Sequence, residues 1–103
     1  PGQLKSHYAP KKPLFIGDIS ELIKSHPGKK ITLLCFGDHK HQAENVVMLN
    51  LSPEKSLEEA ALNLFRYLRL SDESDADIVI CEKLPDEGLG RAINDRLTRA
   101  SVS

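Results

Sequence analysis

The run Ile-Thr-Leu-Leu-Cys-Phe at residues 31–36 is the feature that most constrains the fold of this chain. It is short and almost continuously apolar, a pattern typical of a β-strand that is covered on both of its faces. Strands of this kind belong to parallel sheets, because the crossover connections place helices on the two sides of the sheet. The run therefore predicts a layered α/β domain.

Further strands are predicted at residues 14–16, 45–51 and 78–81, where short apolar runs recur. A short helix is expected after Asp18, whose carboxylate suits the N-cap position. It carries Ile19, Leu22 and Ile23 on one face and stops at Pro27-Gly28.

A longer helix is predicted to open at Ser52-Pro53, because proline suits the first helical position, and Ser56 and Glu59 form an alternative or additional capping box. Its apolar residues recur every three or four positions and predict one buried stripe: Leu57, Ala60, Ala61, Leu64, Phe65 and Leu68. A polar break is expected at residues 71–75. The last helix follows residues 85–90, and its predicted inner face consists of Leu89, Ala92, Ile93, Leu97 and Ala100.

The alternation of strands and helices predicts a three-layer, open, Rossmann-like α/β fold with a mainly parallel sheet of four to five strands and helices on both faces. One connection is unusual, because the link from residue 36 to residue 46 is short for a crossover helix. Either a single helical turn lies there or the second and third strands are antiparallel. We favour the short crossover.

The charge balance argues against a general nucleic-acid-binding surface, because the net charge is −1 and such surfaces carry a basic excess. No apolar run is long enough to span a bilayer, so no membrane contact is expected. Cys35 and Cys81 lie inside apolar runs and are interpreted as buried, reduced thiols, which favours a cytoplasmic location.

Two candidate sites inside the domain are disfavoured. Cys35, His39 and His41 are of ligand types that zinc prefers, but no fourth ligand is near and the spacing matches no standard structural site, so no metal is expected. Gly88 and Gly90 open a helix after a strand, but neighbouring acidic residues would repel a phosphate. Close packing of the helix is the better interpretation of these glycines. Residues 14–103 thus contain no visible catalytic residues.

Residues 1–13 are rich in proline, which excludes a helix or a central strand. His7 and Tyr8 lie between the prolines, and both can hydrogen-bond to a ligand on a neighbouring domain. The alternative is that Tyr8 packs on the surface of its own domain as an anchor. We expect residues 1–13 to be an interdomain linker and residues 14–103 to be a small α/β accessory domain.

The pattern of Pro1-Gly2 followed by His7-Tyr8-Ala9-Pro10 resembles the interdomain linker of two-domain L-threonylcarbamoyladenylate synthases. Residues 61–69 and 88–100 are similar to the long helix and the closing helix of the same family. Residues 3–6 depart from the Met, Lys, Tyr and Arg that are common there, so the roles of those family residues do not carry over.

The resemblance implies a parent nucleotidyltransferase with an N-terminal YrdC-like catalytic domain, which uses threonine, bicarbonate, ATP and Mg²⁺ to make threonylcarbamoyl-AMP for tRNA modification. The present residues would be an accessory domain without catalytic residues or cofactors of its own. Its linker would gate the nucleotide pocket, with His7 and Tyr8 as the contact residues.

Two other functions are compatible with the sequence. Open α/β sheets bind ligands at the carboxyl ends of their strands, so an independent nucleotide-binding module would use the region of Asp18, Asp38, Asn50 and residues 83–90. A tRNA-docking surface would need the basic residues to converge, namely Lys11, Lys12, Lys29, Lys30, Arg91, Arg96 and Arg99.

Overall fold

The structure is a computed structural model that describes residues 10–38 and 44–102. Its strands are β1 (Leu14–Gly17), β2 (Ile31–Phe36), β3 (Val46–Ser52) and β4 (Ile78–Glu82). Its helices are α2 (Ile19–Ser25), α3 (Leu57–Glu73) and α4 (Gly88–Ala100).

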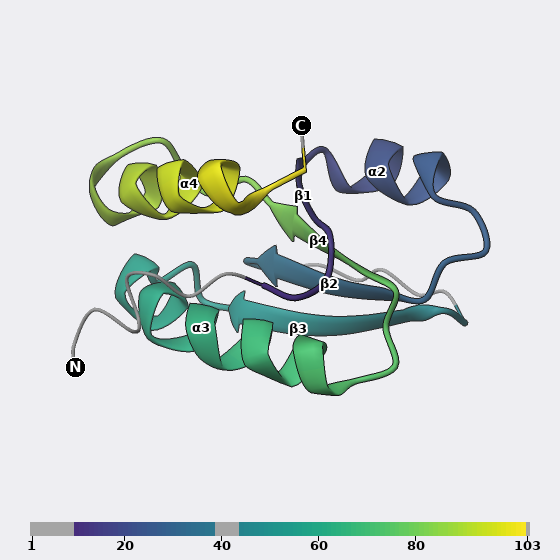
Figure 1. Cartoon of the computed structure of the whole chain (residues 1–103). Coiled ribbons are helices and arrows are strands. Elements are labelled where there is room, and N and C mark those ends of the chain that lie inside the picture. The colour runs from purple at the N-terminus through teal and green to yellow at the C-terminus, as the bar shows by residue number, and fades with distance from the viewer. Residues whose placement is uncertain (1–9, 39–43, 103) are drawn as a thin grey trace.

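The four strands form one parallel sheet in the order β1-β4-β2-β3, seen from top to bottom in Figure 1. The predicted open α/β fold is confirmed. The parallel pairing of β2 with β3 also confirms the favoured alternative for these strands, although most of the link between them lies outside the described residues. Strands β1 and β3 form the two edges of the sheet.

Helices cover both faces of the sheet, as predicted. Helices α3 and α4 contact each other and pack over one face, where the core contains Leu34, Leu51, Leu64, Val79 and Leu97. Helix α2 packs over the other face, where the core contains Ile19, Ile31, Leu33 and Ile80. All six residues of β2 are buried, because this strand lies inside the sheet and is covered from both sides.

Helix α2 begins as predicted, because the side chain of Asp18 accepts a hydrogen bond from the amide of Glu21 at 3.0 Å. The predicted opening of α3 at Ser52-Pro53 is wrong, and the helix begins after the alternative cap, Ser56. Strand β3 runs through Ser52, and the hydroxyl of Ser56 caps α3 by accepting from the amide of Glu59 at 3.1 Å. Pro53 therefore lies in the turn and not in the helix.

The predicted polar break at residues 71–75 is wrong, because α3 continues to Glu73. Ser71 follows Leu68 by three positions, which places it on the inner face of the helix. Its side chain is small enough to fit there, and the residue is only 1% exposed. A polar residue thus continues the buried stripe for one more turn.

The predicted inner face of α4 is partly wrong. Ile93 and Leu97 are buried, but Leu89, Ala92 and Ala100 are exposed. The other inward residues are Gly90 and Asn94. The reason is local: a Cβ atom at Gly90 would lie 1.9 Å from the carbonyl oxygen of Pro85, so only glycine permits this approach.

Close packing is therefore seen at Gly90, but it is against the Pro85 carbonyl of the preceding loop and not against a strand, as the prediction had it. Gly88 has a different role, because its φ of +51° is a left-handed conformation that favours glycine and nothing crowds the position.

Both cysteines are free and buried, as predicted. They lie in different cores, Cys35 on the α2 side of the sheet and Cys81 on the α3 and α4 side. Burial raises the pKa of the Cys35 thiol from 9.0 to about 11 and also raises the pKa of Cys81. In the part of the chain that is described, no helix has the length and apolar character that crossing a membrane requires.

Candidate functional site: the Lys12 anchor and an adjacent groove

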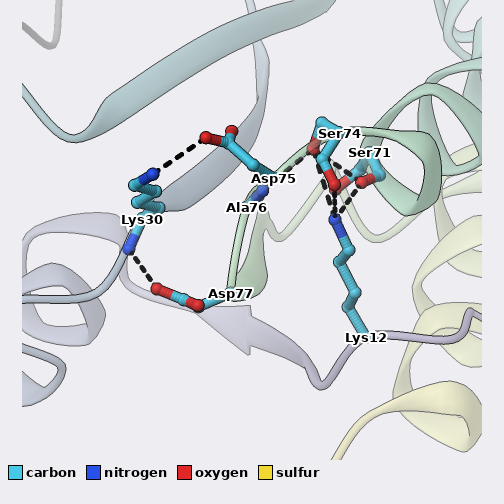
Figure 2. A network of polar contacts seen from close by, with 7 residues as sticks. All are labelled: Lys12, Lys30, Ser71, Ser74, Asp75, Ala76 and Asp77. Carbon is cyan, nitrogen blue, oxygen red and sulfur yellow. Dashed lines mark hydrogen bonds and ion pairs between the residues drawn. The ribbon is translucent and has the colours of Figure 1, made fainter.

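Lys12, at the end of the proline-rich segment, is anchored on the last turn of α3. Its Nζ atom donates to the carbonyl oxygen of Ser71 at 2.6 Å and to that of Ser74 at 2.5 Å. The Ser74 hydroxyl lies 3.3 Å from the same nitrogen. Figure 2 shows the lysine reaching this helix end from the neighbouring chain segment. We call this set of contacts the Lys12 anchor.

The position of the anchor follows from the electrostatics of a helix end. The final carbonyl groups of a helix have no partner within the helix and carry partial negative charge. No basic residue occupies the last turn of α3 itself. Lys12 supplies the missing positive charge from a segment 59 residues away in the sequence.

Two backbone contacts extend the anchor on both sides of Lys12. The amide of Lys11 donates to a carboxylate oxygen of Asp72 at 3.1 Å. The carbonyl oxygen of Pro13 accepts from the amide of Val79 at 2.9 Å, immediately before β1 begins. The chain is therefore fixed against the domain from residue 11 onward. His7 and Tyr8, the predicted contact residues, lie outside the described residues.

A second polar cluster, formed by Lys30, Asp75 and Asp77, holds the loop between α3 and β4 (Figure 2). The Lys30 side chain forms an ion pair with Asp75 at 2.8 Å, which raises the pKa of Lys30 and lowers that of Asp75. The amide of Lys30 donates to Asp77 at 2.8 Å, and the amide of Asp77 donates back to the Lys30 carbonyl at 2.7 Å. This reciprocal pair fixes the amino end of β2 to that of β4.

A groove of about 520 Å³ lies between these two clusters. Its apolar lining comes from the first halves of β2 and β3, from the last turns of α3 and from the loop after α3, and consists of Ile31, Val47, Leu49, Leu70 and Ala76. Ser71 and Ser74, which hold Lys12, also line it. The groove therefore adjoins the Lys12 anchor, at the amino end of the sheet.

The carboxyl end of the sheet, where an open α/β fold would hold a ligand, is braced by its own side chains. Asn50 donates to the carbonyl of Gly37 at 2.7 Å and accepts from the amide of Ser52 at 2.9 Å. Glu82 accepts from the amide of Phe36 at 2.9 Å. These polar groups stabilise loops, which gives the nucleotide-binding alternative no support.

The basic residues are also used within the domain. Lys12 and Lys30 have the partners described above, and Arg91 pairs with Asp86 at 3.1 Å. Lys30 precedes β2 at the amino end of the sheet, whereas Arg91 lies in α4, which follows the carboxyl end of β4. Lys30 and Arg91 thus belong to opposite ends of the sheet, so these two residues give the tRNA-docking alternative no support.

The disfavoured metal site gains no support either. Cys35 is buried inside β2, and His39 and His41 lie outside the described residues. Within residues 10–38 and 44–102, no three His, Cys, Asp or Glu side chains are grouped so that they could hold a metal ion.

Comparison with known protein families matches residues 1–102 to the model described as threonylcarbamoyl-AMP synthase, C-terminal domain. Two curated threonylcarbamoyl-AMP synthases, from Pyrococcus abyssi and Bacillus subtilis, are each 32% identical to the chain. Each alignment covers 98% of this chain but 31% of the relative. The chain therefore spans about a third of the length of these relatives.

Solved structures give the same result. The crystal structure of P. abyssi Sua5 complexed with L-threonine matches with a TM-score of 0.71 and 32% identity, over 92% of this chain and 29% of that one. The C-terminal Sua5 domain from Pyrococcus horikoshii matches with a TM-score of 0.60 and 33% identity, over 87% of this chain and 93% of that one. A variant of P. abyssi Sua5 with a consecutive His and Tyr both replaced by Ala matches with a TM-score of 0.62 and 30% identity, over 87% of this chain and 29% of that one.

Proposed function

Because this chain belongs to the family of threonylcarbamoyl-AMP synthase C-terminal domains, we propose that it is the accessory domain of such an enzyme and that its linker gates the catalytic pocket. The catalytic domain would be the N-terminal, YrdC-like portion of the parent protein. That portion would combine threonine, bicarbonate and ATP, with Mg²⁺, into threonylcarbamoyl-AMP for tRNA modification in the cytoplasm.

The observation that carries this proposal is the Lys12 anchor. A linker that gates a pocket needs a fixed end, because a lid restrains water and controls product release only when its position is defined. Three hydrogen bonds from Lys12 to the end of α3 supply that fixed end. The domain behind the anchor has cores on both faces of its sheet and so provides a rigid support.

His7 and Tyr8 are the proposed contact residues of the gate. The sequence contains the dipeptide His-Tyr once, at these positions. The relative that was solved with a consecutive His and Tyr both replaced by Ala supports a particular role for such a pair in this family. An imidazole and a phenol can each hydrogen-bond to a nucleotide, and the phenol ring can also stack on a base.

The test is the steady-state kinetics of the full-length parent protein, measured as the rate of pyrophosphate release. We expect Tyr8→Ala to slow turnover or to raise the KM for ATP several-fold. We expect Lys12→Met to have an effect in the same direction, because it releases the fixed end of the linker while keeping a side chain of similar length.

Lys11→Met is the matched control, because Lys11 contributes its backbone amide to the anchor and that amide is unchanged by the substitution. Unchanged kinetics for Tyr8→Ala would contradict a gating role. Equal effects of Lys11→Met and Lys12→Met would show that loss of a positive charge, and not loss of the anchor, changes the kinetics.

A further inference from the structure

The groove beside the anchor gathers aliphatic side chains that are exposed in the described part of the chain. Val47 is 63% exposed and Leu70 is 45% exposed, and both line the groove. Val47 belongs to β3, an edge strand of the sheet. Exposed aliphatic side chains are ordinary when they are scattered, but a group of them in one concave surface marks an interaction site.

The occupant is indicated by the course of the chain. Ser71 and Ser74 line the groove and also hold Lys12. Whatever precedes residue 10 in the parent protein is therefore tethered at the edge of the groove. Because the chain covers 31% of its curated relatives, more than two thirds of such a protein lies outside this domain.

We propose that the groove is the docking surface for the catalytic portion of the same polypeptide, which inserts an aliphatic or aromatic side chain between Val47 and Leu70. The inference rests on the proposed function, since it requires a catalytic portion in the same chain.

The test compares amide hydrogen exchange in the full-length protein with exchange in residues 1–103 alone. The isolated domain is a valid reference, because the C-terminal domain of the P. horikoshii relative has been solved by itself. We expect the amides of residues 46–49 and 68–74 to exchange about tenfold more slowly in the full-length protein. Val47→Asp and Leu70→Asp should each remove this difference.

Leu62→Asp is the matched control, because Leu62 is 82% exposed on the same helix as Leu70 and does not line the groove. It should leave the protection unchanged, and circular dichroism would verify that all three variants are folded. Equal exchange in the full-length protein and the isolated domain would overturn the proposal. Protection that increases with the concentration of the isolated domain would indicate a second copy as the occupant and would also overturn it.

Enzyme activity separates this proposal from the proposed function. A full-length protein that makes threonylcarbamoyl-AMP but shows no protection at the groove would refute the docking surface alone. A protein that shows the protection but does not make threonylcarbamoyl-AMP would refute the proposed function and leave the contact surface established.

Discussion

Asn94 makes two buried hydrogen bonds to the backbone of Leu84, and one substitution can replace its donor group with an acceptor. It is 5% exposed, and its side chain accepts from the amide of Leu84 and donates to the carbonyl of Leu84, both at 2.8 Å. These hydrogen bonds hold α4 to the segment that follows β4. Asn94→Asp keeps the size and the acceptor but places a second carboxylate oxygen against the Leu84 carbonyl.

The expected loss of stability at neutral pH is about 3 kcal/mol. Leaving the buried carbonyl without its donor costs about 1–3 kcal/mol. Burial and the facing carbonyl raise the pKa of the new carboxyl above its ordinary value of about 3.9, and each unit of that rise costs a further ~1.4 kcal/mol in the ionised state. Asn94→Ala loses both hydrogen bonds but introduces no charge.

The pH dependence of stability distinguishes the two variants, because only Asn94→Asp introduces a group that titrates. In Asn94→Asp, the protonated carboxyl can donate to the Leu84 carbonyl as the amide does, so the defect should be smallest below pH ~4. It should grow as pH rises from the unfolded-state pKa to the raised folded-state pKa and then stay constant. Urea unfolding followed by circular dichroism between pH 3.5 and 7.5, relative to the unsubstituted chain, measures this difference. A deficit of Asn94→Asp that is independent of pH would refute the reasoning.

Three further predictions concern other parts of the domain. Gly90→Ala should destabilise the fold by roughly 1–3 kcal/mol, because the new Cβ clashes with the Pro85 carbonyl. Gly88→Ala should cost less, about 1 kcal/mol, because it forces alanine into a left-handed backbone without any clash. Thermal unfolding ranks the two variants. The Cys35 thiol, with its pKa raised from 9.0 to about 11, should make stability fall as pH rises from 9 to 11, and Cys35→Ala should weaken that dependence in denaturant titrations. Asp75→Ala removes an ion pair between exposed side chains and should leave the stability measured in the same assay nearly unchanged.

The strands, and the caps of α2 and α3, could be recognised because they depend on local patterns, although Ser52-Pro53 was wrongly preferred as the start of α3. The continuous apolar run of β2 indicated burial on both faces, and Asp18 and Ser56 begin their helices through contacts within one turn. The end of α3 could not be predicted from such patterns. It depends on Ser71 being small enough for the core and on Lys12 neutralising the helix end from another part of the chain.

The candidate site was only partly predictable for the same reason. The sequence indicated the proline-rich segment, but not that Lys12 would meet residues 59 and 62 positions away. The groove combines the beginnings of two strands with the end of a helix, and none of its apolar residues differs in type from those of the core. The inward turn of Asn94 was missed because a polar residue at helical spacing is normally assigned to the exposed face.

The Lys12 anchor also limits how far the linker can reach. A fully extended chain spans at most about 3.3–3.6 Å per residue, so Tyr8 stays within roughly 14 Å of the anchored lysine and His7 within roughly 18 Å. A contact held on so short a tether has an effective concentration in the millimolar range or above. His7 and Tyr8 could therefore bind a pocket with weak intrinsic affinity and still occupy it for much of the time.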